Sequence, residues 1–337
     1  MEEVKNLQAQ EEVVVEAVAE AVAVETPAEP PKAHKKYRRK VSPLFITLGI
    51  VIGLYAISLL TPLIWGFFQS LKTVRDFTAD KVGFIGREGP QWKNYTIVLK
   101  WLKYPKPGIS GGKIGLISMF INSILYALGG AVVQVTVQYV MAYVSARFRY
   151  KFGAFIVGLV IFCMALPIIG SQASSLTLAT HLNLLDSIPG MWLMKAYFLG
   201  MYFLVFHAQL RAFPMDFSEA AAIDGAGNFT IMWRIIFPMV RNTYLTIILL
   251  LFVSYWNDYQ TPLLYLPHKP TLALGLYYFT FQRHIIEGTL PWNQKNLLNG
   301  TPKQIAACYM VLIPILLVFL FLHKRLLGNI SMGGLKE

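Results

Sequence analysis

The stretch that decides the fold is residues 114–146, IGLISMFINSILYALGGAVVQVTVQYVMAYVSA, which contains no charged side chain. It exceeds the roughly 20 apolar residues that an α-helix needs to cross about 30 Å of hydrocarbon. Residues 41–71 form a second uncharged stretch of similar length. Because backbone groups in lipid must be hydrogen-bonded within the protein, and a helix does this locally, both stretches predict membrane-spanning helices.

Further apolar segments raise the predicted number of spanning helices to six. These segments are residues 152–171, 192–210, 239–257 and 305–322. The 337-residue chain is 55% hydrophobic and only 14% charged, a composition typical of polytopic membrane proteins. The predicted fold class is therefore an all-α membrane protein with six transmembrane helices.

The distribution of charge predicts the domain organisation and the orientation. Residues 1–40 start acidic and end in a cluster of Lys and Arg before the first span, which is favoured on the cytoplasmic side of a plasma membrane. Both termini are therefore expected in the cytoplasm. Residues 72–113 carry nine basic and three acidic side chains, which opposes this orientation, but the charge rule weakens for long loops. The expected segments are a cytoplasmic tail (1–40), a first transmembrane helix (41–71), an external segment (72–113), a core with the other helices (114–326) and a cytoplasmic tail (327–337).

Several classes of function find no support in the sequence. The first forty residues lack the apolar core of a secretory signal peptide, so the first span is expected to be retained. The net charge of +12 comes from Lys and Arg that flank apolar spans, which argues against a nucleic-acid partner. A phosphate-loop lookalike at 107–114 has Pro107 in place of its first glycine. We expect no catalytic site, no metal site and no cofactor in this chain, and packing roles for Cys163 and Cys308.

Residues 212–238 form the loop between the fourth and fifth predicted spans, and they predict two short helices joined at a glycine corner. The alanines at 220–222 have the highest helix propensity, and Gly225 suits the left-handed end of a helix. Asn228 is placed to cap a second helix, which Pro238 would end before the fifth span.

The narrow alanine face of this loop would fit a groove of another protein, with Glu219 and Asp224 supplying charges at the rim. The alternative is an amphipathic helix that rests on lipid head groups. The physical chemistry of these residues alone leaves both interpretations open.

The same loop resembles the signature of permease subunits of ABC importers, which reads Glu-Ala-Ala, three residues, Gly, nine residues, Ile, one residue, Leu, Pro. The matching positions are Glu219, Ala220, Ala221, Gly225, Ile235 and Pro238, with Phe237 in place of the usual Leu. Over about residues 40–337 the chain is similar to the carbohydrate branch of that family, which includes the maltose permease subunit MalG. The residues that carry this similarity are Asn122-Ser123, Ala142-Tyr143 with Arg147, Trp256-Asn257-Asp258-Tyr259, and Gly328 with Gly333, Gly334 and Lys336.

The resemblance implies a type I ABC importer permease (MetI-like) fold and ATP-driven import of a sugar or oligosaccharide by alternating access. It implies that the loop is a coupling helix held in a cleft of the ATPase, with Glu219, Ala220, Ala221, Asp224 and Gly225 as coupling residues. The implied partners are a dimer of ABC ATPases that bind the ATP, a second, MalF-like permease, an external solute-binding protein and the lipid bilayer.

Uncharged polar residues are candidates for a solute path through the membrane. Asn122, Gln134 and Gln138 all lie on the second span, and Gln134 and Gln138 share one face of it. Hydrogen bonding between helices is an equally open interpretation of these residues. Trp256, Asn257 and Asp258 suit the mouth of such a path, because Trp is favoured at membrane interfaces and aromatic faces pack against sugar rings.

A carrier or channel driven by an ion gradient is the alternative function. Such a protein is expected to hold a charge pair within the membrane. Lys195 and His207 lie in the fourth predicted span, and no charged partner for either is evident in the sequence. The stretch 281–302, expected outside, is longer than is typical of the family, and its role is open.

Overall fold

A computed structural model describes residues 43–109, 112–148, 151–166, 170–282 and 300–327, with the backbone alone for 151–152 and 322–327. The tail 1–40, most of 281–302, and Gly328, Gly333, Gly334 and Lys336 of the C-terminal tail lie outside these residues. The chain divides into two compact units, Met1–Leu59 and Leu60–Glu337. The boundary falls inside helix α2 (Pro43–Ser70), which carries no charged residue.

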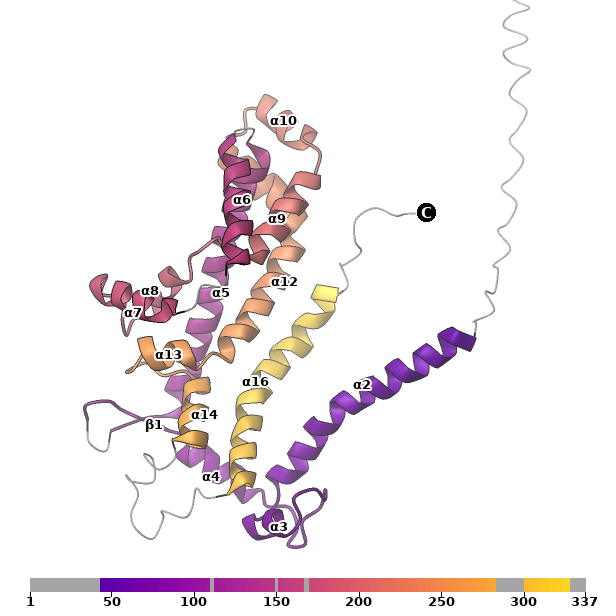
Figure 1. Ribbon diagram of the computed structural model, residues 1–337, viewed down its shortest axis with the longest axis vertical. Helices are drawn as coiled ribbons and strands as arrows, with labels where there is room; N and C mark the ends of the chain where they lie inside the picture. Colours follow the sequence, from indigo (N-terminus) through magenta and orange to yellow (C-terminus); the bar gives the residue numbers. More distant parts are fainter. Residues whose placement is uncertain (1–42, 110–111, 149–150, 167–169, 283–299, 328–337) are drawn as a thin grey trace, which may run out of the picture. The chain divides into compact units, whose positions relative to one another are not determined.

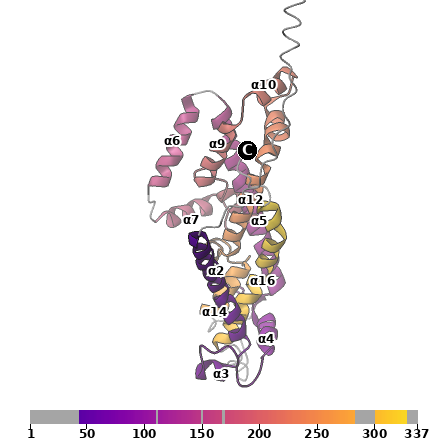
Figure 2. The ribbon, with the colours of Figure 1, turned by 90° about the vertical axis from the view of Figure 1, so that its right-hand side faces the viewer.

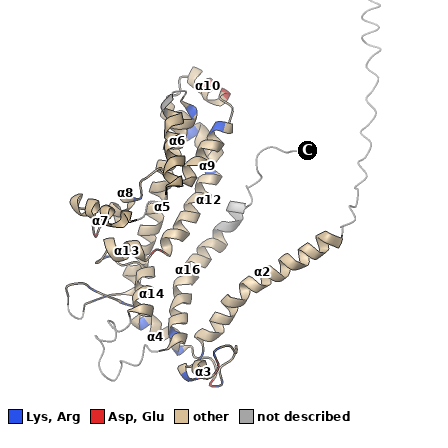
Figure 3. Cartoon of the chain, in the orientation of Figure 1, with Lys and Arg blue, Asp and Glu red and all other residues tan. Residues whose placement is uncertain are grey.

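The second unit is built around helix α5 (Leu116–Arg147). This helix packs against α8 (Ile188–Met194), α9 (Met201–Ala212), α12 (Phe237–Trp256) and α14 (Leu272–Phe281). Figures 1 and 2 show α5 running alongside α9 and α12. Within this unit, charged residues gather at the α10 end and near α3 and α4, whereas the helices between are almost free of charge (Figure 3).

Four helices among the described residues are long and apolar enough to cross a membrane: Pro43–Ser70, Leu116–Arg147, Asn228–Trp256 and Thr301–Phe321. They correspond to the first, second, fifth and sixth predicted spans, and the last belongs to α16 (Thr301–Leu327). Helices α6 (Lys151–Ala165) and α9 occupy the third and fourth predicted positions and are shorter. The all-α membrane fold is therefore confirmed, with two of its predicted helices shorter than expected.

The fourth predicted span, 192–210, is wrong as a single helix. Helix α8 ends at Met194, and α9 does not begin until Met201. Gly200 has an extended backbone, and glycine has a low helix propensity. Lys195 lies in the same break, where a side chain that carries charge would be costly without a partner.

Short elements complete the second unit, and the apolar pattern did not predict them. They are α3 (Val74–Ala79), α4 (Lys93–Trp101), the antiparallel pair β1 (Tyr104–Pro105) and β2 (Lys113–Ile114), α7 (Ser171–His181) and α13 (Gln260–Tyr265). The segment 72–113 is attached to the end of α2 by Asn94, whose amide donates to the carbonyls of Ser70 (2.8 Å) and Lys72 (3.0 Å). The Asn94 amide thus satisfies the Ser70 carbonyl, which the end of the helix leaves free, and the carbonyl of Lys72 just beyond it.

Candidate functional site

The loop that carries the signature folds as a helix, a glycine corner and a second helix, as predicted. Helix α10 (Asp216–Ile223) is followed by Gly225, whose φ of 82° is left-handed. The amide of Ala226 donates to the carbonyl of Ala221 (2.9 Å), so the corner satisfies the end of the helix. Glu219 lies in the first turn of α10, where the helix dipole stabilises a carboxylate.

The second helix differs from the prediction at both ends. Gly227 is its N-cap, so Asn228 is already helical and the predicted cap is wrong. From there α11 (Asn228–Thr230), η1 (Ile231–Ile236) and α12 form one continuous helix. Pro238 lies in the first turn of α12 and does not end the helix. Since proline has no backbone N–H, one α-helical hydrogen bond is lost there, and the preceding six residues are π-helical instead.

Most of the predicted coupling residues face away from the chain. Glu219, Ala220, Asp224 and Gly225 are exposed, whereas Ala221 is buried. Three large apolar side chains are exposed beside them: Phe217 by 52%, Ile223 by 86% and Phe229 by 73%. Exposed apolar side chains beside exposed charges favour a surface that contacts a protein or a membrane. Sequence reasoning missed these three residues, although each lies within ten positions of the signature carboxylate.

Arg147, at the end of α5, holds the segment that enters α10. Its guanidinium Nη1 donates to the carbonyl oxygens of Phe213 (3.3 Å) and Pro214 (3.2 Å) and lies 3.0 Å from the sulfur of Met215. The residue is only 8% exposed. The entry to α10 is therefore fixed to α5 by charge-assisted hydrogen bonds, which are stronger than neutral ones.

Tyr139 holds the segment that leaves the glycine corner. Its hydroxyl donates to the carbonyl of Met232 in η1 (2.8 Å), and its ring lies within 6 Å of those of Phe206, Trp233 and Phe237. Tyr139 is fully buried. Both ends of the signature loop are thus attached to one helix, α5.

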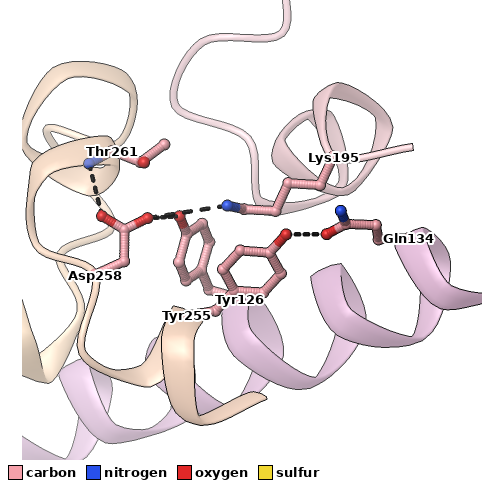
Figure 4. A network of polar contacts seen from close by, with 6 residues as sticks. All are labelled: Tyr126, Gln134, Lys195, Tyr255, Asp258 and Thr261. Atoms are coloured by element: carbon pink, nitrogen blue, oxygen red, sulfur yellow. Dashed lines mark hydrogen bonds and ion pairs between the residues drawn. The ribbon is translucent and has the colours of Figure 1, made fainter. Parts of the chain in front are cut away.

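A second polar site lies between α5, the break before α9, and the turn after α12 (Figure 4). Asp258 accepts hydrogen bonds from the hydroxyl of Tyr126 (2.6 Å) and the backbone N–H of Thr261 (3.0 Å). The ammonium of Lys195 lies 3.9 Å from the same carboxylate. Tyr255 donates its hydroxyl proton to the side-chain oxygen of Gln134.

Lys195 is held by aromatic rings as well as by charge. Its Nζ lies 3.6 Å from the ring centre of Tyr255 and 5.0 Å from that of Tyr126, both within cation–π range. Gly130 leaves room for the lysine stem, because a Cβ there would lie 3.0 Å from the Lys195 Cδ. The absence of a charged partner for Lys195, inferred from the sequence, is wrong: Asp258 is that partner.

Residues 138–329 match the family of the binding-protein-dependent transport system inner membrane component. The chain belongs to this family of ABC importer permeases. The permease is accordingly a multi-pass component of the inner membrane. Its family consists of transport components and not of known enzymes. Membership implies ATPase and binding-protein partners and a second permease.

Curated relatives of the permease come from several bacteria. The sulfoquinovosyl glycerol permease SmoH of Agrobacterium fabrum is 24% identical over 82% of this chain and 89% of its own length. The diacetylchitobiose uptake permease NgcG of Streptomyces coelicolor is 22% identical, covering 83% and 85%. The arabinooligosaccharide permease AraQ of Bacillus subtilis is 25% identical, covering 67% and 76%.

A solved structure supports the fold of the permease. A chain of a bacterial ABC transporter involved in the import of the acidic polysaccharide alginate superposes with a TM-score of 0.66. The two chains are 20% identical, and the match covers 83% of this chain and 95% of the other. The ion-gradient carrier that the sequence left open finds no support in these comparisons.

The structure brings together only some of the residues predicted to line a path. Gln134 is buried and joins the polar site through Tyr255, which is the helix-to-helix bonding that the sequence left open. Gln138 is 1% exposed, and its side-chain oxygen makes no hydrogen bond within the described part of the permease. Asn122 lies apart from both and donates to the carbonyl of Pro270 (3.1 Å).

The residues at the end of α12 have separate environments. Asp258 belongs to the polar site, whereas the exposed Asn257 donates back to the carbonyl of Val253 (2.9 Å). Trp256 is 2% exposed, and its indole N–H donates to the carbonyl of Val311 (3.3 Å). The tryptophan ring is therefore covered by the permease itself rather than presented at an open mouth.

Proposed function

We propose that this permease imports a glycoside or an oligosaccharide. The observation that carries the proposal is the family match together with three relatives whose names specify sulfoquinovosyl glycerol, diacetylchitobiose and arabinooligosaccharides. All three compounds contain sugar units. The resemblance to the carbohydrate branch in the sequence, including MalG, agrees with this class of solute.

Coupling to ATP hydrolysis is proposed to run through α10. Glu219 and Asp224 would meet the rim of a cleft in the ATPase, and Ala220, Ala221 and Gly225 would shape the contact. The exposure of most of these residues, close in sequence to three exposed apolar side chains, supports a partner surface. ATP would be bound by the ATPase dimer, with no cofactor in this chain. Coupling then requires that the loop bind the two states of the ATPase with different free energies.

The assembly is proposed to contain a second, MalF-like permease and an external solute-binding protein. With α10 in the cytoplasm, the end of α5 at Arg147 would also lie there. Both termini are proposed to lie on the same side of the membrane. Positive charge at Arg147 and Arg211, near this end of the bundle, agrees with the bias of cytoplasmic loops.

The polar site is proposed to border the solute path. Gln134, Gln138 and Asn257 offer hydrogen bonds without charge, and the Lys195–Asp258 pair would join the segments on either side of the path. Asn122 and Trp256 would act nearer the outer end, if the conformation that admits solute uncovers them.

Site-directed crosslinking tests the coupling proposal. Cysteines are placed at Glu219 and Ile223, both exposed on α10, and as a control at Leu99, which is 51% exposed on α4. In native membranes the first two should crosslink to an ATPase subunit and the third should not. Failure of both α10 cysteines to capture an ATPase, with the protein inserted normally, would overturn the proposal.

Uptake assays test both the class of solute and the source of energy. The permease, purified with its native partners and reconstituted in vesicles, should accumulate labelled oligosaccharides only with ATP and the binding protein present. Transport by this chain alone, driven by an ion gradient, would contradict the proposal.

A further inference from the structure

A pocket of about 460 Å³ lies between the end of α5, the start of α6 and the end of α9. Arg147, His207 and Arg211 line it. No Asp or Glu is among the described residues that line it. The pocket is thus basic, and it directly adjoins the segment that enters α10.

Two of the basic side chains are buried with polar atoms unused. Arg147 is 8% exposed and His207 is 9% exposed. The Nε and Nη2 atoms of Arg147 and both ring nitrogens of His207 make no hydrogen bond within the described residues. Buried polar atoms nearly always have a partner, because an unpaired one has lost its water without compensation. The free N–H groups of a guanidinium require an acceptor, and an anion is the acceptor that it binds best.

Apart from Ser145, the rest of the lining is apolar, which favours an anion that also carries hydrocarbon. Val157 of α6, Leu210 of α9 and Phe213 lie on the wall. Gly153 lets α6 approach α5 closely, because a Cβ there would lie 2.9 Å from the carbonyl oxygen of Ser145. A ligand with a phosphate at one end and hydrocarbon at the other matches this combination better than a free phosphate does. Basic pockets between helices at the cytoplasmic face are known to bind the head groups of anionic lipids.

We propose that this pocket binds the phosphate of an anionic phospholipid from the cytoplasmic leaflet. The leaflet rests on the proposed function, which puts the α10 end of the bundle in the cytoplasm. Arg147 then acts on both sides: Nη1 holds the carbonyls of Phe213 and Pro214, while Nε and Nη2 face the lipid phosphate. A bound lipid would hold the Arg147 guanidinium in place, and this guanidinium in turn holds the segment that enters α10. Lipid binding would therefore support the proposed coupling.

Native mass spectrometry of the purified full chain tests the site directly. Phosphatidylglycerol should remain bound where phosphatidylcholine does not. A basic side chain near an anionic head group contributes about 1 kcal/mol, so Arg211→Gln should weaken phosphatidylglycerol binding roughly fivefold. His207→Leu should weaken it as well. Arg234→Gln removes an exposed arginine of η1 that does not line the pocket, and it should leave binding unchanged.

Results from this experiment, from thermal unfolding with added ligands and from crosslinking can each overturn the proposal. Equal binding of the two lipids, or equal loss with Arg211→Gln and Arg234→Gln, would mean that no specific site exists. Protection of the fold by inorganic phosphate, with no added effect of phosphatidylglycerol, would identify a small anion as the ligand. A disulfide between Arg211→Cys and a cysteine placed in a partner subunit of the assembled transporter would identify a protein contact instead.

Lipid binding is measured on this chain alone, so its result does not depend on the ATPase. If the α10 cysteines capture no ATPase but phosphatidylglycerol binds selectively, the coupling proposal fails and the lipid site stands. If they capture an ATPase and the lipid does not bind, the lipid site fails alone.

Discussion

Helix α10 and the polar site around Lys195 and Asp258 differ in whether their charges are paired within the chain. At α10, Glu219 and Asp224 are exposed and make no ion pair among the described residues. In the polar site, Lys195 and Asp258 are mostly buried and pair with each other, with tyrosines closing the site around them. The difference teaches that the second region pairs its charges within the chain, whereas the charges of the first are left for the partner that the proposed function assigns to it. Changes at α10 should therefore affect transport, and changes in the polar site should affect stability first.

The largest effect is expected at the glycine corner. Gly225→Val places a β-branched residue at a φ of 82°, which L side chains rarely adopt, so α10 should lose its angle and uptake should fall to background. Glu219→Lys should abolish uptake by reversing a rim charge. The matched control is Gly227→Ala, since Gly227 has an ordinary φ and open space around it. Normal uptake by both variants, with normal amounts in the membrane, would remove the coupling role.

The next effect concerns the buried ion pair. Asp258→Asn leaves the Lys195 ammonium without its counter-charge, and removing one partner of a buried pair costs about 3 kcal/mol or more. The double variant Lys195→Met with Asp258→Asn should recover much of that loss. Unfolding in detergent, arranged as a double-mutant cycle, measures the coupling. Additive losses would show that the two residues do not interact.

A smaller effect is expected at the attachment of η1. Tyr139→Phe removes the hydroxyl that serves the buried carbonyl of Met232, which should lower the free energy of unfolding by about 1–2 kcal/mol. Tyr143→Phe, one turn further along α5, is the control. If the proposed coupling is right, Tyr139→Phe should also reduce the uptake obtained per ATP hydrolysed, which a purely local packing role would leave unchanged.

The smallest effect is expected at Asn122. Asn122→Ala removes one partly buried hydrogen bond to Pro270, worth about 1 kcal/mol or less. Because Asn122 lies outside the polar site, its loss should not add to the effect of Asp258→Asn beyond simple summation. A strong non-additive interaction in unfolding would place Asn122 in the same network after all.

The sequence was sufficient for features that lie in consecutive residues. Uncharged runs located the long helices, and the spaced signature from Glu219 to Pro238 located a loop that folds as a helix, a glycine corner and a second helix. It was insufficient where residues distant in the chain meet. Lys195 and Asp258 have no sequence relationship that reveals their pairing, and the same lysine stands in the break that interrupts the fourth predicted span.

Local rules also failed where a larger context outweighed them. Asn is a favoured N-cap and proline a common helix terminator, yet Gly227 caps the helix and Pro238 lies within it. Burial of Ile231, Met232 and Ile236 against the bundle favours a continuous helix at this point. The exposure of the apolar side chains of α10 could not be predicted from the sequence for another reason. Hydrophobicity alone does not say whether an apolar residue of a loop faces inward.

The attachment of both ends of the signature loop to α5 has a mechanical consequence. Tyr139 and Arg147 are about 12 Å apart along that helix, given a rise of 1.5 Å per residue. Because the loop is attached to α5 at two separated residues, it cannot rotate about either attachment alone. If the proposed coupling holds, a force applied at α10 would displace or tilt α5 as a whole, and the movement would reach Tyr126, which binds Asp258 in the polar site.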